Sequence, residues 1–194
     1  MQTILGAGGV IGRELAQTLQ KYTPDIRLVS RNPQKVNEGE QLHPADLRDP
    51  GQTDAAVAGS EVSYLTVGLP YRYQTWKSDW PVIMENVIEA CKKHGTRLVF
   101  FDNIYMYEGE CLDPITESLP LNPPSNKGQV RAQIATRLMD HVQNGSLQAL
   151  IARSADFYGP GTQGVSMLME TVIKPLAENK KANWLGGADK KHSF

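Results

Sequence analysis

The sequence predicts an α/β fold built on a doubly wound parallel sheet. Short apolar runs alternate with amphipathic stretches along the 194 residues, as in a series of strand–helix–strand units. A glycine-rich segment follows the first apolar run and opens the first amphipathic stretch, where parallel α/β folds turn from strand to helix. The length is sufficient for one domain with a full core, or for one domain and an additional part.

The expected strands are short apolar runs at 3–5, 26–30, 62–67, 97–101 and 149–152. The run at 97–101 is apolar on both alternating faces, so we expect helices on both sides of it. A turn-rich stretch that ends at Pro50 separates the second and third of these strands, and a last strand and turn are expected at 184–187.

Helical spacing of apolar residues predicts helices over 10–19, 80–94, 127–142 and 165–177. Gly95 directly follows the second of these, where a glycine commonly ends a helix. Pro175 interrupts the last one. Strands that alternate with helices in this way indicate right-handed crossovers within one sheet.

Composition excludes several classes of protein. The 20 Lys and Arg residues nearly balance 21 Asp and Glu residues, so no overall basic charge exists to hold nucleic acid. No apolar run approaches the ~20 residues that cross a bilayer, and the N-terminus has no signal-peptide pattern. Cys91 and Cys111 form no CxxC pair, and no histidine spacing indicates a metal. We expect a cytoplasmic protein without a metal, a nucleic-acid partner or a membrane partner.

The glycine-rich segment has the GxxGxxG pattern of a dinucleotide-binding loop. The first glycine permits a tight turn, the middle pair lets a pyrophosphate approach the backbone, and the last lets the helix pack closely on the strand. The helix start adds free N–H groups and a partial positive charge. The alternative is a glycine-rich turn without a ligand. The expected cofactor-binding residues here are Gly6, Gly8, Gly9, Val10, Ile11 and Gly12.

The second expected strand ends in Ser30 and Arg31, where NAD-binding folds usually carry an acidic residue that accepts from the ribose 2′-OH. Arg31 has the chemistry to bind a 2′-phosphate, and Lys35 adds charge nearby. This pattern favours NADP, with NAD as the alternative cofactor. An arginine at a strand end is otherwise an ordinary solvated residue.

Several motifs together resemble the NAD(P)-dependent epimerase/dehydratase family of extended or atypical short-chain dehydrogenases/reductases. They are GAGGVIG at 6–12, SRN at 30–32, ADL at 45–47, TVGLPY at 66–71, FFDNIYMYEG at 100–109, TE at 116–117, KGQVRA at 127–132, ARSADFYGP at 152–160 and WLGG at 184–187. The resemblance implies a Rossmann-type NAD(P)-binding domain over 1–160. It also implies an incomplete substrate-binding region over 161–194.

The resemblance also implies positions along the cofactor. Asp46 would accept from the adenine amino group, and Leu47 would pack on the adenine face; a turn cap is the alternative role of Asp46. Thr66, Val67 and Gly68 would lie along the cofactor after the third expected strand. The resemblance further implies a small-molecule substrate. Members of the family often dimerise, so a homodimer is also a possible state of this protein.

The chain departs from the family at the catalytic positions. Family enzymes use a Ser or Thr, and a YxxxK pair whose lysine lowers the tyrosine pKa. Here Lys127 and Arg131 stand where the Tyr and Lys belong, and Asn103 stands where the Ser belongs. A helix start and a nearby arginine both favour a neutral Lys127, which could then act as general acid or base. Arg131 itself stays charged and could bind the ribose or the diphosphate of the cofactor. Tyr105 or Tyr107 could instead supply the missing hydroxyl. A solvated helix face is the alternative for the two cations.

A group of aromatic residues follows the third expected strand, at Tyr71, Tyr73, Trp76 and Trp80. These rings either line a substrate pocket or seal a helix against the sheet, and we expect packing for Trp80. The function predicted from these residues is an NAD(P)-binding oxidoreductase or epimerase acting on a small carbonyl or alcohol. The alternatives are a non-catalytic NADP sensor and an inactive cofactor-binding fragment.

Overall fold

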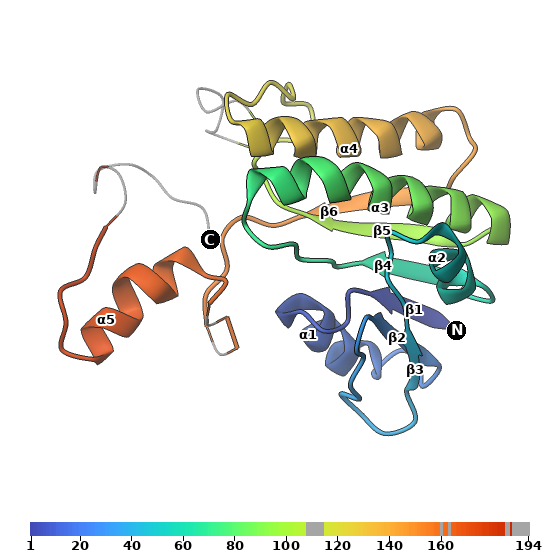
Figure 1. Ribbon diagram of the computed structural model, residues 1–194, viewed down its shortest axis with the longest axis horizontal. Helices are drawn as coiled ribbons and strands as arrows, with labels where there is room; N and C mark the ends of the chain where they lie inside the picture. The colour runs from blue at the N-terminus through green and yellow to red at the C-terminus, as the bar shows by residue number, and fades with distance from the viewer. Residues whose placement is uncertain (108–114, 160, 163, 185–186, 188–194) are drawn as a thin grey trace. The chain divides into compact units, whose positions relative to one another are not determined.

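The computed structural model of the protein describes residues 1–107, 115–159, 161–162, 164–184 and 187 (Figure 1). The chain divides into two compact units, Met1–Ala152 and Arg153–Phe194. The boundary that the sequence suggested, at residue 160, stays a prediction. No helix among the described residues is long and apolar enough to cross a membrane.

A six-stranded sheet forms the centre of the first unit. Its strands are β1 (Gln2–Leu5), β2 (Ile26–Ser30), β3 (Gln41–Pro44), β4 (Val62–Leu65), β5 (Arg97–Asp102) and β6 (Ala149–Arg153). The strand order is β3-β2-β1-β4-β5-β6, and the strands from β3 to β5 pair in parallel. The chain therefore reverses its winding between β1 and β4, where open α/β sheets place a ligand crevice at the carboxyl ends of the strands.

Helices cover both faces of this sheet (Figure 1). They are α1 (Val10–Leu19), α2 (Pro50–Val57), α3 (Tyr73–His94) and α4 (Asn126–Gln143). Because side chains alternate along a strand, Ile4 packs in the cluster under α1, and the next residue, Leu5, packs in the cluster under α2, α3 and α4. The doubly wound fold that the sequence predicted is confirmed.

Three elements differ from the sequence predictions. The edge strand β3 and the helix α2 were not predicted, and α3 begins at Tyr73 rather than at residue 80. Pro81 lies inside α3, although proline is most favourable in the first turn of a helix. Asp49 caps α2 by accepting from the backbone N–H of Gln52, at 2.9 Å.

The second unit contains a π-helical turn, η2 (Met169–Ile173), followed by α5 (Lys174–Ala177), within the predicted helix at 165–177. The strand and turn expected at 184–187 fall partly outside the described residues.

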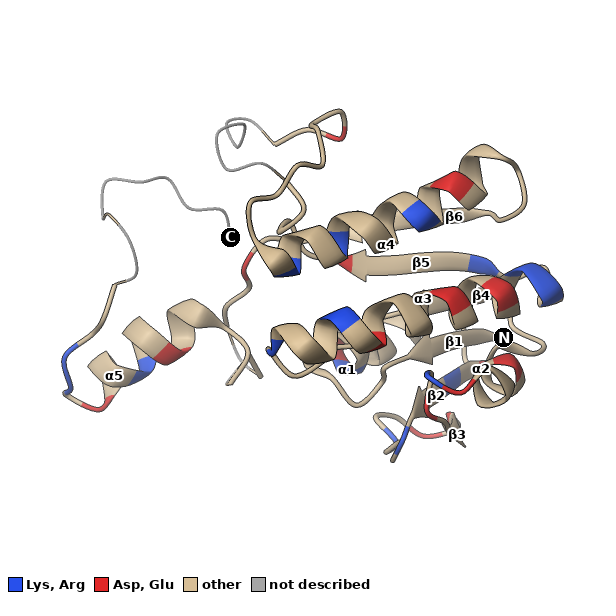
Figure 2. Ribbon diagram, turned by 45° about the horizontal axis from the view of Figure 1, so that its top comes forward, with Lys and Arg blue, Asp and Glu red and all other residues tan. Residues whose placement is uncertain are grey.

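In the first unit, α3 and α4 each carry side chains of both charges (Figure 2). Arg137 of α4 and Glu85 of α3 form one ion pair between these helices, at 2.9 Å.

Candidate functional site

The glycine loop joins β1 to α1 at the carboxyl edge of the sheet. The backbone N–H groups of Gly6 and Ala7 both donate to the carbonyl of Val29, at 2.9 and 3.0 Å, so the loop is fastened to the end of β2. Gly6 has a φ of +100°, a conformation that side chains rarely adopt. The tight turn expected at this glycine is present.

The four loop glycines serve two different purposes. A Cβ at Gly6 would lie 2.7 Å from the backbone nitrogen of Val67, and one at Gly12 would lie 2.8 Å from the Cα of Ala7, so the protein itself fills both spaces. At Gly8 and Gly9 the nearest atoms would lie 3.8 and 3.6 Å away, and both residues are exposed. The space beside the middle pair is therefore left for something other than this chain.

The start of α1 faces this space with unpaired backbone donors. Gly9 is the N-cap residue, has no side-chain capping bond, and is followed by a first turn without acidic residues. The first N–H groups of a helix have no partner within it, so those of Val10 and Ile11 are available to an anion. An exposed glycine pair beside such donors fits a pyrophosphate, which is what a dinucleotide would present here.

Ser30 and Arg31 lie next to the loop at the end of β2. The Ser30 hydroxyl would be 3.8 Å from a Cβ placed on Gly8, which puts this side chain beside the middle of the glycine loop. Arg31 is exposed and lies close enough to Asp46 to favour its charged form. Arg31 is thus an exposed cation directly after β2, and its contact with a 2′-phosphate stays a prediction.

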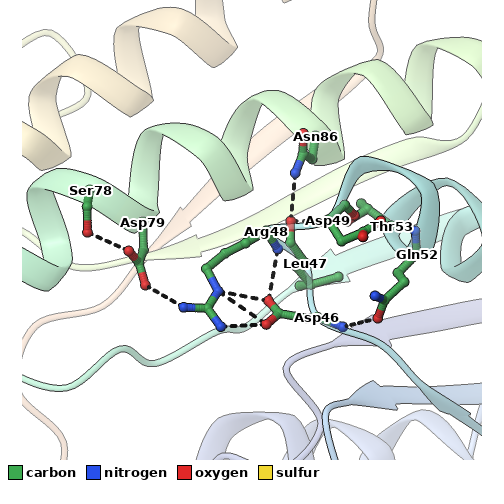
Figure 3. A network of polar contacts seen from close by, with 9 residues as sticks. All are labelled: Asp46, Leu47, Arg48, Asp49, Gln52, Thr53, Ser78, Asp79 and Asn86. Carbon is green, nitrogen blue, oxygen red and sulfur yellow. Dashed lines mark hydrogen bonds and ion pairs between the residues drawn. The ribbon is translucent and has the colours of Figure 1, made fainter.

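Asp46 lies at the centre of a polar network between β3 and α3 (Figure 3). Arg48 donates to its carboxylate from Nη2 at 2.5 Å, from Nε at 3.0 Å, and from the backbone N–H at 3.0 Å. Arg48 Nη1 also reaches Asp79 of α3, at 3.4 Å. Hydrogen bonds from Arg48, followed by its charge, lower the pKa of Asp46 to about 2. The turn-type bond to the backbone is present, and the adenine contact stays a prediction.

The backbone of Leu47 is held by side chains of α2 and α3. Its carbonyl accepts from the Thr53 hydroxyl at 3.1 Å and from the Asn86 amide at 2.9 Å (Figure 3). Its side chain is only 6% exposed and belongs to the main core. Little of it therefore remains to contact a ligand. The sequence analysis did not identify Arg48 or Asp79, although the D-x-R spacing was visible.

The residues after β4 pack against the glycine loop. The Thr66 backbone N–H donates to the Leu5 carbonyl at 2.8 Å, and its hydroxyl donates to the same oxygen at 3.2 Å. Val67 lies in contact distance of Gly6, and Gly68 is exposed. Thr66 and Val67 therefore lie beside the glycine loop, and the expected position of Thr66, Val67 and Gly68 along the cofactor stays a prediction.

Asp102 and Asn103 lie at the carboxyl end of β5. The Asp102 carboxylate is fully buried and accepts from the backbone N–H of Asn103 at 2.8 Å. The Asn103 side chain accepts from the backbone N–H of Tyr105 at 3.0 Å. Asn103 thus shapes the turn that presents Tyr105, whose side chain is 36% exposed. The buried Tyr107 offers much less surface.

Arg131 of α4 points to this strand end. Its Nη1 lies 3.4 Å from Asp102 Oδ1, and its guanidinium carbon lies 4.0 Å from the centre of the Trp80 ring. Burial lowers the pKa of Arg131, while the charges of Asp102 and Tyr105 act in the opposite direction. Trp80 is fully buried, as the sequence predicted. Arg131 is therefore a fixed internal cation rather than part of a solvated helix face.

Lys127, one turn earlier in α4, lies over an aromatic group. Its Nζ is 2.9 Å from the centre of the Tyr71 ring and 5.7 Å from that of Trp76. Tyr105 stacks on Trp76 at 6.3 Å and meets Tyr71 edge-on at 6.3 Å. We call Tyr71, Trp76 and Tyr105 the aromatic triad. The triad brings together the loop after β4, the first turn of α3 and the end of β5.

Gly128 permits α4 to approach this strand end. A Cβ on Gly128 would lie 2.3 Å from the carbonyl oxygen of Tyr105 and 2.5 Å from the side chain of Pro123. Ser125 caps the helix by accepting from the Gly128 N–H at 3.0 Å. The glycine between Lys127 and Arg131 therefore holds the helix start against the backbone of Tyr105.

Comparison with solved structures shows the same fold in nucleotide-dependent enzymes. UDP-glucuronic acid 4-epimerase from Bacillus cereus, in complex with NAD, has a TM-score of 0.80 and 20% identity, over 96% of this chain and 66% of that one. The dTDP-glucose 4,6-dehydratase DesIV from Streptomyces venezuelae, with NAD bound, has a TM-score of 0.78 and 15% identity, over 96% and 65%. Uronate dehydrogenase from Agrobacterium tumefaciens has a TM-score of 0.67 and 19% identity, over 76% and 57%.

The chain thus spans between 57% and 66% of the length of these three structures, and at such identities the likeness shows the fold. A search of curated proteins found no match. The model of the NAD dependent epimerase/dehydratase family, however, matches residues 3–194, nearly the entire sequence. With the parallel sheet, the glycine loop and this match, the chain belongs to the NAD dependent epimerase/dehydratase family.

Proposed function

We propose that the protein is an NADP-dependent oxidoreductase or epimerase that acts on a small carbonyl or alcohol substrate. The observation that carries this proposal is the division of the loop glycines. The protein fills the space beside Gly6 and Gly12 but leaves it open beside Gly8 and Gly9, at the start of α1. A bound nicotinamide cofactor would supply the hydride chemistry, and the chain would orient the substrate and move a proton.

Residues on four strand ends would hold the cofactor. Gly8, Gly9 and the first N–H groups of α1 would bind the pyrophosphate, and Arg31 would bind the 2′-phosphate. Asp46 would accept from the adenine amino group by releasing one of its bonds to Arg48, because each of its carboxylate oxygens already accepts two. Thr66, Val67 and Gly68 would line the segment between the two halves of the cofactor.

We assign the transfer of the proton to or from the substrate oxygen to the Tyr105 hydroxyl. Tyr105 is part-exposed at the carboxyl end of β5, and its charged form interacts favourably with the buried guanidinium of Arg131. Arg131 would then be the cation near the hydroxyl, in the place of the lysine of the YxxxK pair. Asn103 would hold the turn in place, and Lys127 would add a second positive charge.

The test uses two variants of the full chain. Tyr105→Phe keeps the stacked ring but loses the hydroxyl, so we expect turnover to fall about 10²–10⁴-fold with unchanged NADP binding. Turnover is followed as NADPH oxidation across a panel of small aldehydes and ketones. Tyr107→Phe is the matched control and should keep full activity. Full activity in Tyr105→Phe would contradict the assignment.

An epimerase regenerates its cofactor and shows no net NADPH oxidation, so interconversion of sugar epimers is followed by NMR as well. Binding of NADP with neither NADPH oxidation nor epimer interconversion would instead favour the non-catalytic sensor. That outcome has an observable basis in this chain, because Lys127 and Arg131 replace the usual tyrosine and lysine. We also propose a cytoplasmic location, which is supported by the free and buried thiol of Cys91.

A further inference from the structure

Lys127 carries a positive charge that no carboxylate offsets among the described residues. Lys92, Lys93 and Lys180 each form an ion pair with an acidic side chain, at 2.6 to 2.7 Å. Lys127 instead contacts the faces of Tyr71 and Trp76. Ring faces attract a cation and hold it in place, but they carry no net charge to neutralise it.

The neighbouring charges do not change this balance. Arg131 is the other cation of the site, and Asp102 lies 3.4 Å from it, so these two charges offset each other. Asp102 is fully buried beneath Arg131, which leaves Lys127 as the cation at the carboxyl end of β5 that no carboxylate of the described residues offsets. Such a cation favours a negatively charged ligand group.

The group around Lys127 is accessible. Tyr71 is 63% exposed and Tyr105 is 36% exposed, whereas Trp76 beneath them is buried. Lys127 itself is half-buried. A ligand that reaches Lys127 would therefore meet one ammonium group and the edges or faces of two tyrosine rings, which suit the C–H surface of a small organic molecule.

We propose that Lys127 binds a carboxylate of the substrate, so that the substrate is a carbonyl or alcohol compound that also carries a carboxylate. The inference rests on the proposed function for the presence of a substrate at this edge of the sheet. A carboxylate has two acceptor oxygens, whereas a phosphate monoester has three strong acceptor oxygens and calls for more donors. The one ammonium group of Lys127 therefore suits the carboxylate better. Lys127 is then a substrate-binding residue, and the proton transfer belongs to Tyr105.

Three sugars serve as matched probes: D-glucuronate, its uncharged analogue D-glucuronamide, and D-glucose 6-phosphate. Each is titrated by calorimetry into the full chain at low ionic strength, with and without NADP. The wild type should bind glucuronate at least tenfold more tightly than glucuronamide, and more tightly than glucose 6-phosphate. Lys127→Gln should remove the preference over the amide, and Lys127→Arg should retain most of it. Lys92→Gln, which removes a lysine on α3 that has an acidic partner, should change nothing.

Equal binding of glucuronate and glucuronamide, or a preference that survives Lys127→Gln, overturns the inference. Tighter binding of glucose 6-phosphate overturns the choice of a carboxylate, and the absence of binding by all three probes overturns the site. A separate NADP titration reports on the proposed function. Carboxylate preference without NADP binding would contradict the cofactor proposal and leave the Lys127 site standing, whereas NADP binding without carboxylate preference would do the reverse.

Discussion

Arg131 and Asp102 form an ion pair in which Nη1 lies 3.4 Å from Oδ1, with the guanidinium 7% exposed and the carboxylate fully buried. The pair connects α4 to the end of β5, and Trp80 covers the guanidinium from the side of α3. Removing two charges from water is costly, and that cost is recovered only when both partners are present. The pair therefore constrains which substitutions the site tolerates.

We expect Arg131→Met to lower the free energy of unfolding by about 3–5 kcal/mol, because it removes the cation next to the buried Asp102 carboxylate. The double variant Arg131→Met, Asp102→Leu should be more stable than that single variant, since neither charge remains. Urea unfolding of the two single variants and the double variant measures the coupling. Strictly additive losses would mean that the two charges do not stabilise each other.

Substitution of the loop glycines should affect nucleotide affinity at Gly9 and stability at Gly12. Gly9→Val should fold with a loss of at most about 1 kcal/mol, because Gly9 has the extended conformation of an N-cap and an open space beside it. Its nucleotide affinity, measured by calorimetry, should fall below detection. Gly12→Val is the matched control: its Cβ would meet the backbone of Ala7, so we expect about 1–3 kcal/mol of destabilisation. Unchanged NADP affinity in folded Gly9→Val would exclude this loop from the binding site.

Arg31 should decide between the two cofactors. A guanidinium binds a phosphate through charge-assisted bonds, and an exposed one contributes at the low end of about 1.5–3 kcal/mol, or about tenfold in Kd. Arg31→Ala should therefore weaken NADP binding about tenfold and leave NAD binding nearly unchanged. Higher salt should narrow the difference in the wild type. Equal affinities in the wild type, or an NADP preference that persists in Arg31→Ala, would contradict the proposal.

The decrease in the free energy of unfolding at low pH should depend in part on Arg48. The Asp46 pKa of about 2 lies below its ordinary value, so the ion pair stabilises the fold above about pH 4 and is lost as the pH falls towards 2. Because Asp46 and Arg48 are part-exposed, the gain is below about 1 kcal/mol. Carbon NMR titration should show a raised Asp46 pKa in Arg48→Ala, and an unchanged one in the control Arg137→Ala. An Asp46 pKa that stays near 2 in Arg48→Ala would mean that other groups depress it.

The sequence predicted the elements whose apolar residues repeat with a clear period, and it missed those without one. β3 is polar and mostly exposed because it lies at the edge of the sheet, so no apolar alternation marks it. In α2 the side chains are small, and only the capping Asp49 and the following Pro50 signalled its start. The apolar spacing predicted α3 only from residue 80, whereas the helix begins at Tyr73 and continues through Pro81.

The candidate site, too, could be predicted from the sequence only in part. The positions of Gly6 and Thr66 follow from parallel-sheet topology, because every strand end meets at one edge. The contact of Lys127 with Tyr71 depends instead on the path of the loop after β4, which no local pattern encodes. Arg131 was expected at the YxxxK position, but its pairing with Asp102 required the distance between α4 and β5.

Gly128 has a consequence for redesign of this site. The carbonyl of Tyr105 occupies the place of its missing side chain, so the start of α4 and the end of β5 are in direct backbone contact. Any larger residue at Gly128 would separate them and would move Lys127 away from Tyr105 at the same time. Placing a tyrosine at 127 and a lysine at 131 would therefore put two different side chains on a helix whose start is held close to the Tyr105 carbonyl by Gly128.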